Sequence, residues 1–350
     1  MTPMPSDAPA REPNNPVGSF SWGGLLRRPE SGAFLGLLSM FIFFTIFGGL
    51  SFLTIGSIGA WMNIAAGLGI IAIPIGLLMI AGELDISVGS MVPAGSMTIA
   101  IICGHYHMPI WLGVAAVLLL GIIVGLINGN LVVRTAVPSF IVTLGTLFAM
   151  AGFILGLSVI ITGTTSVALK APPLAKAIFG DLYFGKQFQV IIAWWLAAAA
   201  AYIFFIHYSK YGNWIFAMGG DRVAARNAGV PTSRVTITLF VISATSAAFV
   251  GMCQAILFNS AQVSGGQSYI FNSIIAVVVG GVLLTGGFGS VIGILFGTIT
   301  FAIVTQGIYY TNFDRNWSSL IIGLLLLVAV LTNNTFRKMA LTYSPKKKLS

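Results

Sequence analysis

Two carboxylates, Glu83 and Asp85, lie in the segment GELDISVGS, which joins two long apolar runs. They are the acidic residues closest to the apolar core of the chain. An ionisable group at membrane depth is costly and indicates a functional site. The carboxylate of Asp85 can also cap the amino terminus of the helix that follows, and Glu83 can face cytoplasmic water. The segment therefore predicts either a helix cap or direct contact with a passing solute, by these residues: Gly82, Glu83, Asp85, Ser87, Gly89 and Ser90.

A second group of charged residues lies between His207 and Arg234. Gly219 and Gly220 break the preceding structure, Asp221 is a favoured N-cap, and Gly229 with Pro231 signals a stop. The pattern predicts a short isolated helix, about 10 Å long at the usual rise per residue. Its proposed contact residues are Gly219, Gly220, Asp221, Arg222, Ala224, Ala225, Arg226 and Gly229, with Asp221, Ala224, Ala225 and Ala228 on one small-residue face. The alternative is a solvated loop of basic residues.

Other chemistries find no motif in the sequence. No Gly-Lys-Ser or Gly-Lys-Thr occurs, so the chain is not expected to hydrolyse nucleotide. There is no H-E-x-x-H and no G-x-S-x-G, and His105 with His107 supplies too few ligands for a metal site. Cys103 and Cys253 are expected to pack as small hydrophobic residues. The sequence therefore predicts a protein that is not an enzyme.

The elements that position these residues are apolar helices. Only 7% of the 350 residues are charged and 57% are hydrophobic, whereas a soluble surface requires about a quarter of charged residues. We expect an all-α polytopic membrane bundle of about ten spans, because about 20 apolar residues cross the hydrocarbon layer as a helix. The third and eighth are short or Gly-interrupted, which is typical of helices inside a bundle. The ten ranges are 33–53, 62–80, 86–104, 110–130, 139–161, 188–206, 235–258, 273–284, 290–309 and 317–331.

The basic residues predict the orientation. With ten spans and a cytoplasmic amino terminus, thirteen of the seventeen Lys and Arg lie on the cytoplasmic side. This is the positive-inside bias, so the net charge of +9 indicates membrane topology and not nucleic-acid binding. We expect three regions: a proline-rich disordered cytoplasmic tail at 1–31, a transmembrane domain at 32–335, and a basic cytoplasmic tail at 336–350.

A faint repeat is also visible, because Gly76, Gly82 and Gly89 have the same spacing as Gly280, Gly286 and Gly293. Three glycines in a chain with 42 of them make a weak signal.

Four segments together resemble one family. GELDISVGS resembles the signature after the second helix of sugar-type permeases of bacterial ATP-binding-cassette importers, the group that includes ribose and xylose permeases. GGDRVAARNAGV resembles the cytoplasmic coupling segment of that family. VPSFIVTLGT from Val137 and IIAVVVGGVLLTGGFGSVIGILFGT from Ile274 agree in order and spacing. The resemblance runs from about Met62 to Asn333; Glu83, Pro74 and Asp221 depart from the usual Gly, Gly and Asn.

The resemblance implies a permease subunit in the bacterial inner membrane, translocating a monosaccharide or related polar solute. Its implied partners are a cytoplasmic ATPase, a periplasmic sugar-binding protein and a second permease copy or paralogue. The ATPase uses ATP and Mg, and this chain binds no cofactor. Closure of the ATPases is expected to press the helix at 221–229 and to tilt the sixth and seventh spans as levers.

Two alternatives stay open. In an ion-coupled secondary transporter, Glu83 or Asp85 would bind a proton or sodium. A branched-chain amino acid permease of the same superfamily shares the general plan, although the pattern from Gly219 to Gly229 resembles the sugar branch more closely. A channel is a weaker option, because no filter motif is visible. The sequence does not name the sugar.

Overall fold

The computed structural model describes residues 29–135, 137–311 and 314–317, together with residues 320, 323, 324, 327, 328 and 331. Within this part, eight helices are long and apolar enough to cross a membrane, which confirms an all-α polytopic bundle. The two predicted terminal tails lie almost entirely outside the described residues, and so does most of the tenth predicted span.

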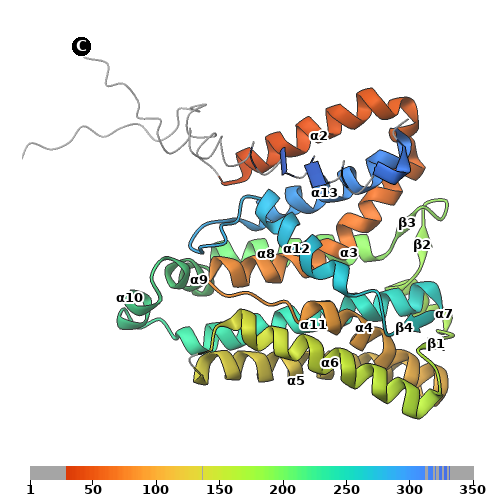
Figure 1. Cartoon of the computed structure of the whole chain (residues 1–350), viewed down its shortest axis with the longest axis horizontal. Coiled ribbons are helices and arrows are strands. Elements are labelled where there is room, and N and C mark those ends of the chain that lie inside the picture. The colour runs from red at the N-terminus through yellow and green to blue at the C-terminus, as the bar shows by residue number, and fades with distance from the viewer. Residues whose placement is uncertain are drawn as a thin grey trace, which may run out of the picture.

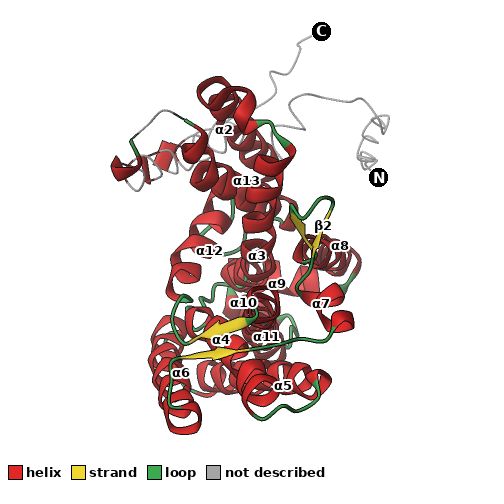
Figure 2. Cartoon of the chain, turned by 90° about the vertical axis from the view of Figure 1, so that its right-hand side faces the viewer, coloured by secondary structure: helices red, strands yellow, loops and turns green. Residues whose placement is uncertain are grey.

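The long helices lie side by side in rows (Figures 1 and 2). α5 and α6 each begin directly after a proline, Pro109 and Pro138, which fits a helix start but cannot continue a helix. α6 ends at Gly163, whose φ of +70° is the left-handed conformation that glycine adopts freely. The spanning helices are α2 (Pro29–Phe52), α3 (Ile55–Ile80), α4 (Val88–Ile99) with the π-helix η1 (Ala100–His105), α5 (Ile110–Arg134), α6 (Ser139–Thr162), α8 (Ile191–Tyr208), α11 (Thr232–Phe258) and α13 (Val291–Gly307) with the 3-10 turn η2 (Ile308–Tyr310).

Short elements lie at the two ends of the bundle. α9 (Lys210–Gly220) and α10 (Arg222–Asn227) lie at one end, on the left in Figure 1. At the other end lie α7 (Pro173–Phe179) and two small antiparallel pairs, β1 (Ser166–Ala168) with β4 (Ser260–Gln262) and β2 (Leu182–Tyr183) with β3 (Phe188–Gln189). A further 3-10 turn, η3, spans Arg315–Trp317.

The eighth predicted span is a short helix, α12 (Gln267–Val279). Its 13 residues reach about 20 Å, which is less than the roughly 30 Å thickness of the hydrocarbon layer. The prediction of a span at 273–284 is therefore wrong in register, because the helix begins earlier and stops at the glycines 280 and 281. The prediction that this element is too short for a full crossing is confirmed.

Glycines allow backbone contact between the central helices. Gly121, Gly125 and Gly129 on α5 face the backbone of α11, where an added Cβ would collide. Gly95 of α4 likewise lies against the carbonyl of Ala248 on α11. Lipid supplies little drive for helix association, so close backbone packing of this kind holds spanning helices together. α4 and α11 form the tightly packed centre of the bundle.

The glycines whose spacing repeats faintly in the sequence lie near the ends of α3 and α12 and the starts of α4 and α13. α3 and α12 both end with a left-handed glycine, Gly82 (φ +82°) and Gly281 (φ +88°). At each end, the N–H two residues past the cap bonds back across the last turn, Glu83 to Leu78 and Val282 to Val277. Gly82 thus matches Gly281 in its role at a helix end, and Gly286 shares its left-handed φ (+83°) without ending a helix.

Candidate functional site

The short helix predicted after Gly220 is α10, and its cap is confirmed. Oδ1 of Asp221 accepts hydrogen bonds from the N–H groups of Val223 (2.8 Å) and Ala224 (2.9 Å). Gly229 ends the element with a φ of +87°. The sequence missed α9, which Ser209 caps and which Gly219 and Gly220 complete as its last two residues. α10 is therefore the second of two short helices that follow α8.

The small-residue face predicted for α10 is exposed at Asp221, Ala224 and Ala228, but not at Ala225. Ala225 is only 5% exposed and packs into the bundle, so it cannot meet a partner. Arg226 is exposed as well, and so is one large apolar side chain of this helix: Val223 is 70% exposed. The sequence reasoning missed Val223 because it searched for small residues. An apolar side chain at the tip of a capped helix is a candidate anchor for another protein.

Gly219 fixes the end of α9 against the rest of the bundle. A Cβ at this position would collide with the carbonyl of Ile80, at the end of α3, and with the N–H of Gly287. These two groups are hydrogen-bonded to each other at 2.8 Å. Gly286 lies against both Gly219 and Gly82, whereas a Cβ on Gly220 would meet nothing within 4 Å. Gly219, Gly82 and the loop at 280–290 therefore converge at one point.

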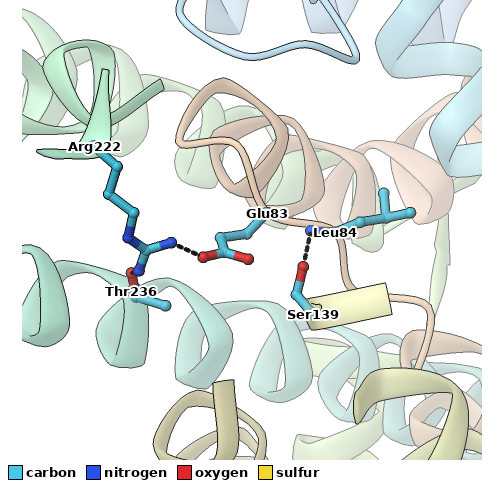
Figure 3. A network of polar contacts seen from close by, with 5 residues as sticks. All are labelled: Glu83, Leu84, Ser139, Arg222 and Thr236. Carbon is cyan, nitrogen blue, oxygen red and sulfur yellow. Dashed lines mark hydrogen bonds and ion pairs between the residues drawn. The ribbon is translucent and has the colours of Figure 1, made fainter. Parts of the chain in front are cut away.

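An ion pair links α10 to the segment after α3 (Figure 3). Nη1 of Arg222 donates to Oε1 of Glu83, and Nη2 of the same guanidinium donates to Oγ1 of Thr236 on α11 (2.8 Å). Glu83 is 7% exposed, so the expectation that it faces cytoplasmic water is wrong. The adjacent N–H of Leu84 donates to Oγ of Ser139 on α6 (3.1 Å). One arginine thus joins three separate parts of the chain.

A second, buried network holds the next residues of the segment. Oδ1 of Asp85 accepts from the N–H (2.9 Å) and the hydroxyl (2.6 Å) of Ser87. Nδ2 of Asn128 on α5 donates to Oγ of Ser87 (3.0 Å), and Thr146 on α6 donates to Oδ1 of Asn128. The hydroxyl of Ser90 donates to the carbonyl of Ser87 (2.9 Å). The non-helical segment between α3 and α4 is therefore fixed by side chains from α5 and α6.

The four segments that carry the family resemblance meet at this end of the bundle. Ser139, Thr143 and Thr146 belong to the segment VPSFIVTLGT, and they bind the GELDISVGS segment directly or through Asn128. Gly219 belongs to the coupling segment and Gly287 to the glycine-rich segment that begins at Ile274. Gly89 lies against the side chain of Ile270, on the first turns of α12. The structure therefore brings together residues that are far apart in the sequence.

Asp85 does not cap α4 itself. Its carboxylate binds the residue that comes just before the helix. Its partner is Ser87, the residue that precedes α4, and the helix itself begins at Val88. Asp85 lies between the spanning helices α3 and α4, and burial raises the pKa of its carboxyl group. The buried hydroxyl of Ser243 on α11 interacts with the carboxyl group of Asp85 and lowers its pKa, but burial has the larger effect. The carboxyl group thus stabilises a turn and lies next to α11.

Asp85→Asn should separate this structural role from contact with solute. Asparagine keeps the oxygen that accepts from Ser87, so we expect transport within twofold of the unaltered protein. Asp85→Leu leaves the Ser87 donors unpaired and should destabilise the fold by about 1–3 kcal/mol. Thermal unfolding in detergent and solute uptake measure the two effects. A stable Asp85→Asn protein without transport would instead show that the carboxyl group itself acts on the passing solute.

The described residues hold no group of three or more His, Cys, Asp or Glu side chains that could bind a metal ion. In this site a capped helix, an ion pair and a fixed turn connect several spanning helices, so movement of one of these elements can be transmitted to the others. That the chain binds no cofactor stays a prediction.

Comparison with known proteins gives one family. The model described as "Branched-chain amino acid transport system / permease component" matches residues 57–330. The fructose import permease protein FrcC of Rhizobium meliloti is 29% identical over 311 residues, which cover 87% of this chain and 84% of the relative. The autoinducer 2 import system permease protein LsrD of Salmonella typhimurium is 28% identical, with coverage of 75% and 79%. The inner membrane ABC transporter permease protein YjfF of Escherichia coli is 29% identical, with the same coverage. No solved structure matches the chain significantly.

Proposed function

Because the chain belongs to the family of permease components of branched-chain amino acid transport systems, we propose that it is the membrane-spanning subunit of an ATP-driven importer. The solute is a monosaccharide or a related small polar molecule. Curated relatives named for fructose and autoinducer 2 import support this choice within the family. The chain supplies the path through the inner membrane, and a separate cytoplasmic ATPase uses ATP and Mg. A periplasmic binding protein and a second permease subunit complete the importer.

The observation that carries this proposal is the geometry of α10. The helix is capped at Asp221, presents Val223 to solvent, and is tied by Arg222 to Glu83 and Thr236. A capped helix held in this way can move as a rigid body when the ATPase acts on it, and it can transmit this movement to the parts of the chain that Arg222 binds. On this proposal the α10 end faces the cytoplasm, in agreement with the basic residues gathered there: Arg134, Lys210, Arg222, Arg226 and Arg234.

Two contacts of Arg222 would transmit movement of α10 into the bundle. One runs from Arg222 to Thr236 on α11, the seventh predicted span. The other runs from Arg222 through Glu83 to the fixed segment before α4, and this route was not expected from the sequence. Movement of α10 would therefore displace α11 and α4 relative to each other, and the two helices pack backbone against backbone. Separation of these helices is the proposed step from one access state to the other.

The ion-coupled alternative receives less support from the site. The carboxylate of Glu83 forms an ion pair with Arg222, and one carboxylate oxygen of Asp85 accepts a hydrogen bond from the N–H of Ser87. A sodium site needs several free oxygens, whereas the described residues hold no group of three or more His, Cys, Asp or Glu side chains.

Reconstitution tests the proposal. The permease, its ATPase and its binding protein are placed in proteoliposomes, and uptake of labelled D-fructose, D-ribose and L-leucine is followed with ATP or with a non-hydrolysable analogue. We expect uptake that needs hydrolysis and favours a sugar. Uptake by the permease alone, driven by a proton or sodium gradient, would contradict the proposal.

Val223→Asp should uncouple the ATPase. A carboxylate at the exposed tip of α10 removes the apolar anchor without touching the buried side of the helix, so the protein should insert and fold normally. We expect at least a tenfold loss of ATPase co-purification and of ATP-dependent uptake. Leu174→Asp makes the same change at an exposed residue of α7, at the opposite end, and should leave ATPase binding unaltered. Equal ATPase binding by the Val223→Asp and unaltered proteins would exclude α10 as the contact.

A further inference from the structure

A cavity of about 240 Å³ lies in the half of the bundle opposite α10. Four elements surround it: the middle of α4, the last turns of α11, the strand β4 and the non-helical residues before α12. The lining residues are Val92, Pro93, Ser96, Gln254, Phe258, Ser260, Gln262, Ser264, Gly265 and Gly266. Because α12 is too short to cross the layer, these non-helical residues lie against the backbone of α4, where Gly266 meets the carbonyl of Gly89. Irregular backbone at such a depth is typical of a lined cavity.

Backbone packing joins the two helices that border the cavity. Beside the cavity, Gly251 of α11 touches the carbonyl of Val92, which is itself a lining residue, and Gly95 of α4 touches the carbonyl of Ala248. Neither contact leaves room for a side chain. The same two helices therefore pack closely beside the cavity and also border it, so their separation would enlarge the cavity.

The lining is polar but carries no charge among the described residues. Gln254 lines the cavity, its Nε2 donates to the hydroxyl of Tyr269, and no donor among the described residues binds its amide oxygen. Within the described part of the chain, the side chains of Ser96, Gln262 and Ser264 make no hydrogen bond. Val92, Pro93 and Phe258 add apolar surface. A carboxylate or ammonium group would lose its water here without a counter-charge, whereas hydroxyl groups and an apolar ring face find partners.

The volume fits a small ligand. Sites for drug-sized molecules measure about 300–1,000 Å³, and this cavity is smaller. A single monosaccharide suits both the size and the mixture of hydroxyl, amide and apolar surfaces.

We propose that this cavity holds the solute during its passage and selects a neutral, polyhydroxylated molecule over an amino acid. The inference rests on the proposed function and adds the place and the chemistry of the passage site. α11 connects the cavity to α10. Three residues of α11, Thr236, Ser243 and Gln254, are spaced by seven and eleven residues, about two and three helical turns. These residues meet Arg222, Asp85 and the cavity in turn.

Cysteine labelling tests whether the cavity is open to water. Both native cysteines are replaced with alanine, and Ser96→Cys or Ser273→Cys is introduced into the complete importer. Ser273 is a matched control, because it is buried on α12 but does not line the cavity. A small neutral, water-soluble reagent, 2-hydroxyethyl methanethiosulfonate, should label Ser96→Cys at least ten times faster than Ser273→Cys. Equal rates would overturn the assignment of this cavity as a water-filled site.

Blocking the cavity after assembly tests whether the solute passes through it. The folded Ser96→Cys importer is treated with benzyl methanethiosulfonate, and uptake of D-fructose, D-ribose and L-leucine is measured before and after. We expect the maximum rate of sugar uptake to fall more than tenfold and to return with dithiothreitol. Thr238→Cys, at an exposed residue near the other end of α11, should lose less than twofold. Unchanged uptake in modified Ser96→Cys, or preferred uptake of leucine by the unaltered importer, would overturn the inference.

The two proposals fail in different ways. An importer without ATP-dependent uptake of any of the three solutes would contradict the proposed function, while the labelling rates would still decide whether the cavity is open. ATP-dependent sugar uptake that modification of Ser96→Cys leaves unaltered would contradict the passage site alone.

Discussion

Replacing Arg222 with methionine is expected to lower ATP-dependent uptake more than tenfold while α10 still binds the ATPase. The substitution keeps much of the length of the side chain but removes both guanidinium contacts, to Glu83 and to Thr236. Glu83 would then be a nearly buried carboxylate without its cation, which is a costly arrangement. Thermal unfolding, ATPase co-purification and uptake in proteoliposomes measure the three effects separately.

A double substitution separates the stability of the pair from its role in transport. Glu83→Gln combined with Arg222→Met removes both charges, so the thermal stability lost in Arg222→Met should largely return. Uptake should stay low, because no strong link joins α10 to the segment before α4. If uptake returned together with stability, the ion pair would be a structural contact alone. Arg222→Lys keeps the charge without the forked geometry and is expected to give intermediate uptake.

The contrast between these variants distinguishes two forms of the coupling mechanism. A lever through α11 alone needs only the contact with Thr236, and Thr236→Val should then reduce uptake as much as Arg222→Met. A second route through Glu83 makes the motion of α4 depend on α10 as well. Since α4 and α11 both border the cavity, the two routes together would move both of its walls.

The features that follow from local sequence were predictable. The N-cap at Asp221, the stop at Gly229 and the apolar spans depend on residues close together in the chain, and the structure confirms them. The ion pair between Glu83 and Arg222 joins residues 139 positions apart. Each residue had a simpler local interpretation, water contact for Glu83 and membrane orientation for Arg222. Only the packing of Gly219 against the end of α3 brings them together.

The burial of Ala225 and the exposure of Val223 on α10 could not be predicted from the sequence for a related reason. On a helix of six residues, sequence spacing places Ala224, Ala225 and Ala228 on one side but does not say which side meets the bundle. That choice depends on where Arg222 and α11 hold the helix. The result is that Ala225 is buried and Val223 is exposed, so a bulky acidic residue at Ala225 would disrupt packing and would not report on the ATPase contact.

Gly219→Ala is expected to have the largest effect of any single methyl group added to the coupling site. The new Cβ would collide with two backbone groups, the carbonyl of Ile80 and the N–H of Gly287, and neither can rotate away. Overpacking of this kind costs about 1–3 kcal/mol, although alanine is the better helix former by about 1 kcal/mol. We expect a clear loss of thermal stability and of uptake, because α9 must move away from the end of α3.

Gly220→Ala is the matched control, since it adds the same methyl group one residue later on the same helix. Nothing lies within 4 Å of its Cβ, and its backbone does not have a positive φ. Helix propensity should therefore make Gly220→Ala neutral or slightly more stable, with normal uptake. Equal behaviour of the two variants would mean that the ends of α9 and α3 are not in contact. Because Arg222 follows only three residues after Gly219, loss of that contact would also remove the reason why Arg222 reaches Glu83.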